Sequence, residues 1–272
     1  MTWSRYVAIG DSFTEGMSDP DPQHEDRFRG WADLLAAQLA VQANAAGAPF
    51  AYANLAVRGR KLDDVVGAQL QAALDLKPDL VSVVGGGNDI LRPTVDLDAI
   101  ASRLDDAVGR LRGAGIDVLM ATPTDTRDAG LFKPLRARHA VHAANVFTIA
   151  QRHGAHVLNL WGITSIRDWR MWGDDRIHLS TQGHRRVMNA ALLALGMPPA
   201  DPDWDLPLPP ADPQARVEQL REHLDWARAH ATPWVQRRLR GTSSGDLRTA
   251  KRPTLEPITE SDGGTGHRRT SR

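Results

Sequence analysis

The stretch Leu80-Val-Ser-Val-Val-Gly-Gly-Gly-Asn88 decides the fold class. An apolar run of this length, ended by glycines, is typical of a strand that is buried on both faces, as in parallel sheets covered by helices. Residues 62–74, before it, have the spacing of an amphipathic helix. Residues 97–113, after it, repeat apolar side chains every three or four positions, with Asp96 as a helix cap. The central strand therefore lies between two helices.

The same alternation extends in both directions along the chain. Further strands are predicted at residues 7–9, 50–55, 118–121 and 156–160, and further helices at 31–40, 136–153 and 181–195, the last capped by Ser180. Strands that alternate with helices form right-handed βαβ units and a parallel sheet with helices on both faces. We therefore expect an α/β fold over residues 1–200, with functional residues where the strands end.

The composition changes after residue 200. Residues 201–213 contain five prolines and four aspartates, which is typical of a linker. Residues 213–230 have the apolar stripe of a helix, and a short helix restarts at Thr232-Pro233. Residues 241–272 have little apolar content and predict a disordered tail. The expected organisation is a domain over 1–200, a linker and helical extension over 201–240, and a tail over 241–272.

Composition excludes several classes of function. Lys plus Arg and Asp plus Glu number 33 each, which gives no reason to expect nucleic acid or an anionic membrane as a partner. The absence of cysteine excludes disulfides, thiolate catalysis and cysteine-bound zinc. No secretory signal or membrane-spanning run is recognised, so a cytoplasmic location is expected.

Ser12 follows the first predicted strand, in Gly10-Asp-Ser-Phe-Thr-Glu-Gly16. The two glycines permit a sharp turn that presents the hydroxyl at the strand end, although a serine in a tight turn can also be a plain helix cap. A serine becomes a nucleophile only beside a histidine that removes its proton and an acid that orients the histidine. The chain must also supply donors for an oxyanion.

Candidates for these parts lie at other predicted loop positions. Asp175 and His178 stand three residues apart before the last helix, and Asp174 is a rival for the acid. Asn88 could donate its side-chain amide to an oxyanion, and Gly59 its backbone N–H. Taken separately, Asp175 and His178 are also consistent with a charged surface loop, and Asn88 and Gly59 with glycine-containing turns.

Together, Gly10-Asp-Ser12, Gly59, Gly86-Gly-Asn-Asp89 and Asp175-Arg-Ile-His178 resemble the four sequence blocks of the GDSL/SGNH hydrolase family, in the same order, over about residues 5–196. The resemblance implies a three-layer α/β/α sandwich with a five-stranded parallel sheet. It implies a nucleophile at Ser12, a base at His178 and an acid at Asp175. The implied oxyanion hole consists of the N–H groups of Ser12 and Gly59 and the amide of Asn88.

The resemblance predicts a serine esterase or acylhydrolase of lipase, thioesterase or deacetylase type, acting on a small-molecule ester without a cofactor or metal. A binding protein on a hydrolase fold and an acyltransferase are the alternatives. His139 and His142 have a metal-like spacing, but no His-Glu-x-x-His motif occurs. Residues 17–30 either cover the site as a lid or form a solvated connection. Trp161, Trp169 and Trp172 either wall an acyl pocket or pack.

Overall fold

The computed structural model describes residues 2–210 and 245–258. Its sheet has the strand order β5-β4-β3-β1-β2-β6. The strands are β1 (Arg5–Ile9), β2 (Ala51–Asn54), β3 (Leu80–Val83), β4 (Asp117–Ala121), β5 (His156–Leu158) and β6 (Arg252–Pro257). The first five pair in parallel, and β6 pairs antiparallel with β2. The five predicted strands are thus confirmed.

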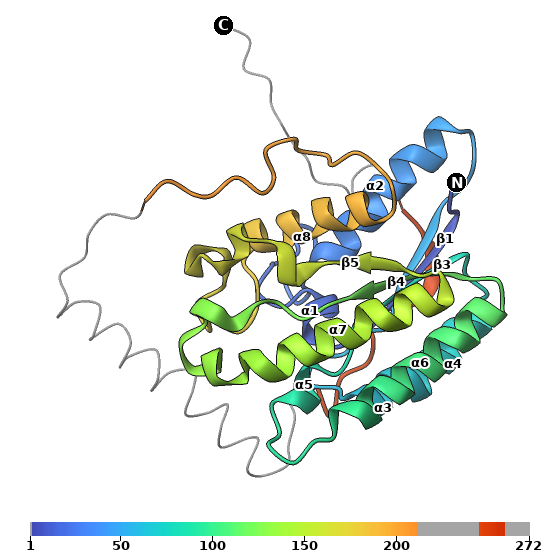
Figure 1. The fold of residues 1–272 in the computed structure, drawn as a ribbon. Coiled ribbons are helices and arrows are strands. Elements are labelled where there is room, and N and C mark those ends of the chain that lie inside the picture. The colour runs from blue at the N-terminus through green and yellow to red at the C-terminus, as the bar shows by residue number, and fades with distance from the viewer. Residues whose placement is uncertain (1, 211–244, 259–272) are drawn as a thin grey trace, which may run out of the picture.

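Helices cover both faces of the sheet, which gives the expected three layers (Figure 1). The helices are α1 (Ser12–Glu15), α2 (Trp31–Ala45), α3 (Leu62–Asp64), α4 (Leu70–Asp75), α5 (Gly87–Ile90), α6 (Leu97–Gly113), α7 (Arg136–His153) and α8 (Thr181–Ala194), with a π-helical stretch, Val65–Gln69, between α3 and α4. Short 3₁₀ turns are Thr126–Asp128, Gly130–Leu135, Leu160–Gly162, Ser165–Arg167 and Trp169–Met171. One layer contains α2 and α8, and the other contains α3, α4, α6 and α7.

Each layer buries its own apolar cluster against the sheet. One cluster packs α2 and α8 around Trp31 and Tyr52, and the other packs α4, α6 and α7 around Leu70 and Ile100. Alternate residues of a strand point to opposite faces, so Ala8 and Ile9 enter different clusters. This two-sided burial explains why the strands are continuous apolar runs.

The caps expected from the sequence set the helix ends. Asp96 accepts hydrogen bonds from the N–H groups of Asp98 and Ala99 at the start of α6, and Ser180 accepts one from Gly183 at the start of α8. At the C-terminal end of α7, Gly154 has φ 63°, the left-handed conformation that glycine adopts without a steric penalty.

The prediction of a disordered tail over 241–272 is wrong for residues 252–257, which form β6 (red in Figure 1). Low apolar content predicted disorder, but this strand is held mainly by backbone pairing with β2. Two apolar side chains, Ala250 and Leu255, also pack against the second cluster. Lys251 adds a partly buried ion pair with Asp33, with Nζ 2.6 Å from Oδ2.

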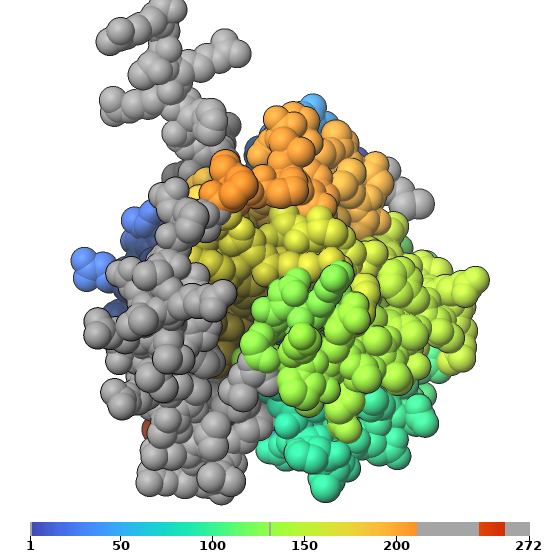
Figure 2. Space-filling view, turned by 60° about the vertical axis from the view of Figure 1, so that its left-hand side comes forward, coloured from blue at the N-terminus to red at the C-terminus, as the bar shows by residue number. Residues whose placement is uncertain are grey.

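The proline-rich stretch at 201–210 lies against the domain surface, where Figure 2 shows it in orange over residues drawn in yellow. Arg186 donates to the carbonyl of Trp204 at 2.6 Å, and the Asp201 N–H donates to Asn189 at 3.0 Å. Ser165 donates to Asp205 at 2.5 Å. These contacts dock a segment that composition predicted to be a linker. The helices predicted between 213 and 240 lie outside the described residues.

Candidate active site

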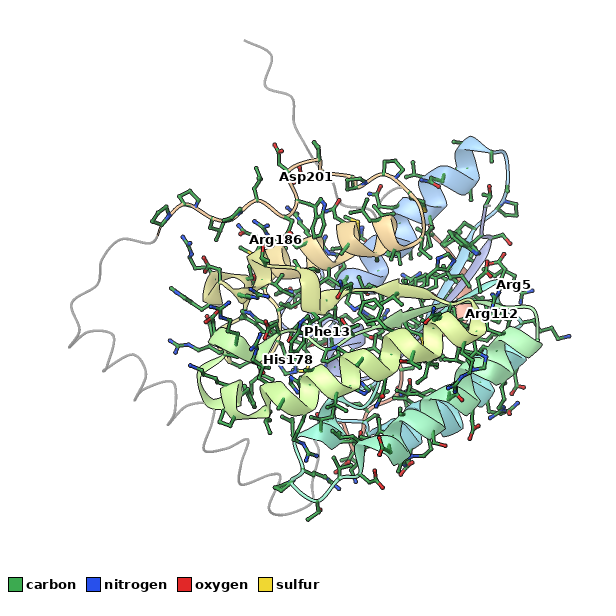
Figure 3. All side chains as sticks on the ribbon, viewed as in Figure 1. Arg5, Phe13, Arg112, His178, Arg186 and Asp201 are labelled. Atoms are coloured by element: carbon green, nitrogen blue, oxygen red, sulfur yellow. The ribbon has the colours of Figure 1, made fainter. Side chains whose placement is uncertain are left out.

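The carboxyl ends of β1 and β3 lie side by side and carry two of the predicted site segments. The strands pair through Ile9 and Val83, so the turns after them start next to each other. Ser12 is the first residue of α1, and Asp11 caps this helix by accepting the Phe13 N–H at 3.1 Å. Figure 3 labels Phe13 and His178 at this end of the molecule and Arg5 and Arg112 at the other.

Gln69 fixes the peptide groups at the start of the Ser12 turn. Its side-chain oxygen accepts the Gly10 N–H at 2.8 Å, and its amide donates to the Gly10 carbonyl at 2.9 Å. Gln69 ends the π-helical stretch, a local irregularity that is frequent at functional sites. Gln69 could not be identified from the sequence, because an isolated glutamine in a helix carries no motif.

Asp175 and His178 lie in one tight turn. The Asp175 carboxylate accepts the N–H groups of Ile177 and His178, both at 2.9 Å, on Oδ1. Its Oδ2 lies 2.6 Å from His178 Nδ1. The turn is closed by the Gly173 N–H, which donates to the His178 carbonyl at 2.8 Å, and Arg176 has φ 53°. The three-residue spacing therefore places the acid and the imidazole in direct contact.

The hydrogen bonds around Asp175 keep its carboxylate charged. Burial raises its pKa, but the hydrogen bond and charge of His178 together with the two backbone N–H groups outweigh burial, and the net pKa lies below the usual value. A charged acceptor at Nδ1 favours the tautomer that carries its proton there, which leaves the lone pair of the imidazole on Nε2. Within the described residues, Ser12 Oγ makes no direct hydrogen bond with His178. Such contacts often form only when substrate binds.

Gly59 lies in a turn formed by residues 57–60. The Arg60 N–H donates to the Val57 carbonyl at 3.3 Å, and Gly59, the third residue, has φ 74°. A positive φ at this place is what a type II turn requires, and it favours glycine. The Val57 N–H donates to the Gly10 carbonyl at 3.4 Å, so this turn lies against the Ser12 turn.

Asn88 connects these two turns. Its amide donates to the Arg60 carbonyl at 2.9 Å and to Asp11 Oδ2 at 3.2 Å. Burial raises the pKa of Asp11 to about 6, against the lowering effects of the Phe13 N–H and His178. Asp89 accepts the Leu62 N–H at 2.9 Å, so both Asp11 and Asp89 hold turns in place. An oxyanion at Asn88 would share or replace the longer contact, that with Asp11.

A buried ion pair that the sequence analysis missed holds the 57–60 turn on α1. Glu15 accepts the Arg58 N–H at 2.6 Å and the Arg58 Nε at 2.9 Å, and it also pairs with the guanidinium terminus. Both side chains are about nine-tenths buried. A Glu and an Arg 43 positions apart give no local signal in one sequence.

Residues 17–30 form a structured loop. Asp19 accepts hydrogen bonds from Thr181 at 2.7 Å and from the Gly30 N–H at 3.1 Å. His184, fully buried, contacts the Met17 carbonyl through Nε2 at 3.1 Å, and its Nδ1 accepts the Trp31 N–H at 3.2 Å. These anchors fix both ends of the loop.

The three tryptophans differ in their surroundings. Trp172 donates from its indole to the Ile166 carbonyl at 2.8 Å and packs against the core, and the Arg136 guanidinium lies over Trp161 at 5.6 Å. Trp169 is 59% exposed. Trp172 therefore fits the packing interpretation, whereas Trp169 lies at the surface.

Within residues 2–210 and 245–258, no group of three or more His, Asp and Glu side chains is arranged to hold a metal ion. His142, one of the two histidines with metal-like spacing, instead contacts the Gly85 carbonyl at 3.1 Å through Nε2. Burial lowers its pKa to about 4. In the same part of the chain, none of the helices is long and apolar enough to cross a bilayer.

Comparison with known proteins places this architecture. The largely parallel sheet between two helical layers is a fold that solved structures of esterases share. The model of the GDSL-like lipase/acylhydrolase family matches residues 8–186, and the chain belongs to this family. Curated proteins compared by sequence give no match.

Solved structures agree with this assignment. LAE5, an alpha/beta hydrolase enzyme from the metagenome of Lake Arreo, Spain, is 25% identical with a TM-score of 0.60, over 71% of this chain and 95% of LAE5. Axe2, an acetylxylan esterase from Geobacillus stearothermophilus, is 21% identical with a TM-score of 0.57, over 71% of this chain and 94% of Axe2. The esterase EstA from Pseudoalteromonas sp. is 15% identical with a TM-score of 0.54, over 71% and 97%. Membership of the family supports ester hydrolysis in general.

Proposed function

We propose that the protein is a serine esterase that forms an acyl-enzyme on Ser12. His178 Nε2 removes the Ser12 proton while Oγ attacks the ester carbonyl, and it then returns the proton to the leaving alcohol. Water, activated by the same nitrogen, hydrolyses the acyl-enzyme. Asp175 keeps the imidazole in the required tautomer and stabilises its charged form.

The contact between Asp175 Oδ2 and His178 Nδ1, at 2.6 Å, carries this proposal. Two backbone N–H groups orient the carboxylate in the folded protein. The conformational entropy of orienting it is therefore lost during folding and not when substrate binds. In a surface loop of unrelated charged residues, three hydrogen bonds from one carboxylate to residues 177 and 178 are not expected.

Three groups are proposed as donors to the oxyanion: the N–H of Ser12, the N–H of Gly59 and the amide of Asn88. The hydrogen bond from Asn88 to the Arg60 carbonyl supports this set, because it places the amide against the turn that contains Gly59. Donors fixed in advance stabilise charge that develops in the transition state without reorganising.

The test combines a fluorophosphonate probe with p-nitrophenyl esters of graded chain length. We expect covalent labelling of Ser12 and ester hydrolysis in the full chain, and loss of both in Ser12→Ala. Ser102→Ala, an exposed serine on α6, is the matched control and should keep both. Unlabelled wild-type protein that is folded and inactive would refute the proposal and favour a binding protein. Ester products formed with an added alcohol in preference to hydrolysis would indicate an acyltransferase.

A further inference from the structure

Gly245 lies against the peptide group that joins Arg58 to Gly59. A Cβ atom at position 245 would overlap the Arg58 carbonyl oxygen and would lie 3.1 Å from the carbonyl carbon and 3.2 Å from Val57 Cγ1. The backbone at 245 needs no positive φ, so the restriction to glycine is one of space. The 57–60 turn and residue 245 are thus in direct backbone contact.

The orientation of this peptide decides where the Gly59 N–H points. In a trans peptide the carbonyl and the N–H point in opposite directions. Since the Arg58 carbonyl faces Gly245, the Gly59 N–H points away from residue 245. The central peptide of a four-residue turn can flip between the type I and type II arrangements, which would reverse both groups.

Residues 245–258, which we call the C-terminal strap, are fixed firmly enough to hold this peptide. Lys251 Nζ donates to the carbonyls of Glu15 at 2.6 Å, Phe28 at 2.8 Å and Arg29 at 2.6 Å, and it pairs with Asp33 at 2.6 Å. β6 adds backbone pairing with β2. Lys251 therefore anchors the strap to the chain both before and at the end of the 17–30 loop.

The opposite side of the turn is fixed by α1 itself. Glu15 accepts the Arg58 N–H at 2.6 Å, and its own carbonyl is one of the Lys251 acceptors. Glu15, the last residue of α1, thus connects the strap to the 57–60 turn. The strap lies outside residues 8–186, the part matched by the family model.

We propose that the C-terminal strap positions the oxyanion hole: Gly245 holds the Arg58–Gly59 peptide in the orientation that directs the Gly59 N–H to the reacting carbonyl, and Lys251 fixes Gly245 relative to α1. This inference rests on the proposed function, because it assigns Gly59 as a donor. Gly245 and Lys251 are positioning residues that do not touch substrate.

The test is Gly245→Ala in the full chain, with p-nitrophenyl acetate as the substrate. We expect kcat to fall by about 100-fold, as for loss of one oxyanion donor, with KM changed much less. Gly113→Ala is the control, because a Cβ there meets no atom within 4 Å, and it should keep kcat. Lys251→Gln, which loosens the strap without adding an atom at 245, should also lower kcat.

A double variant separates positioning from general damage. Alanine at position 59 keeps the backbone N–H, but it disfavours φ 74° and therefore favours the flipped peptide that turns this N–H away. If Gly245 acts through the same peptide, adding Gly245→Ala to Gly59→Ala should lower kcat little further, whereas independent damage would multiply. The inference is overturned if folded Gly245→Ala keeps wild-type kcat, if only KM changes, or if the two losses multiply. Should Gly245→Ala fail to fold, Lys251→Gln in the Gly59→Ala background decides by the same comparison. Failure of wild type to react with the fluorophosphonate probe would instead refute the proposed function.

Discussion

Replacing Lys251 with methionine removes the cation from a cluster of four oxygen acceptors. The methionine has a similar length but donates no hydrogen bond, so three carbonyls and the Asp33 carboxylate lose a donor. The side chains of Lys251 and Asp33 are only 12% and 19% exposed, so water replaces the ammonium poorly. Breaking a buried ion pair from one side costs about 3–5 kcal/mol. We expect about 3 kcal/mol, because some water reaches the pair.

Chemical denaturation at pH 8 measures this loss directly, and thermal unfolding should show a melting temperature lower by about 6–12 °C. Burial raises the pKa of Asp33 to about 6 and Lys251 lowers it, so removing Lys251 raises this pKa further. The variant carboxyl is therefore neutral at low pH, and its charge destabilises the fold only as pH rises through the raised pKa. The loss should be smaller at pH 5 than at pH 8. Lys133→Met, at an exposed position, is the control. A change below about 0.5 kcal/mol at pH 8 would refute the reasoning.

Three further predictions concern the site and its support. Asn88→Ala should fold and lose about 100- to 1,000-fold in kcat, measured with p-nitrophenyl esters; full activity would remove Asn88 from the oxyanion hole. Asp175→Asn should lower kcat by about 10,000-fold while labelling by the fluorophosphonate probe slows in parallel, and unchanged rates would exclude Asp175 as the acid. Burial lowers the pKa of His184 to about 4, so wild type loses stability as pH falls from 6.5 to 4. His184→Gln lacks this loss, and its stability deficit relative to wild type should shrink by about 3 kcal/mol over that range in denaturation curves; a constant deficit would contradict the burial argument.

The strands and helices of residues 1–200 could be predicted well from the sequence, because the signals for them are local. Five strands were found from apolar runs, and the caps at Asp96 and Ser180 fixed the starts of α6 and α8. The contact between Asp175 and His178 also depends on three-residue spacing, which a sequence displays directly. The roles of these residues in catalysis remain predictions.

What the sequence could not predict depends on pairs of residues that are distant along the chain. Glu15 and Arg58 are separated by 43 positions, and Lys251 lies 218 positions from Asp33. β6 was missed for the same reason: Arg-Pro-Thr-Leu-Glu-Pro has little apolar content, and its stability comes from backbone hydrogen bonds with a partner strand. The composition of a segment does not reveal the partner that it pairs with.

The position of β6 also affects how the chain behaves when shortened. β2 would be the last strand on its side of the sheet without β6, and an unpaired edge strand presents free N–H and C=O groups to other molecules. Arg252 and Glu256 place charges on β6, which now forms that edge and is less prone to associate. A chain cut back to the family-matched residues would lose this protection, and we expect it to aggregate through β2 even if its helices and its acid–base pair form correctly.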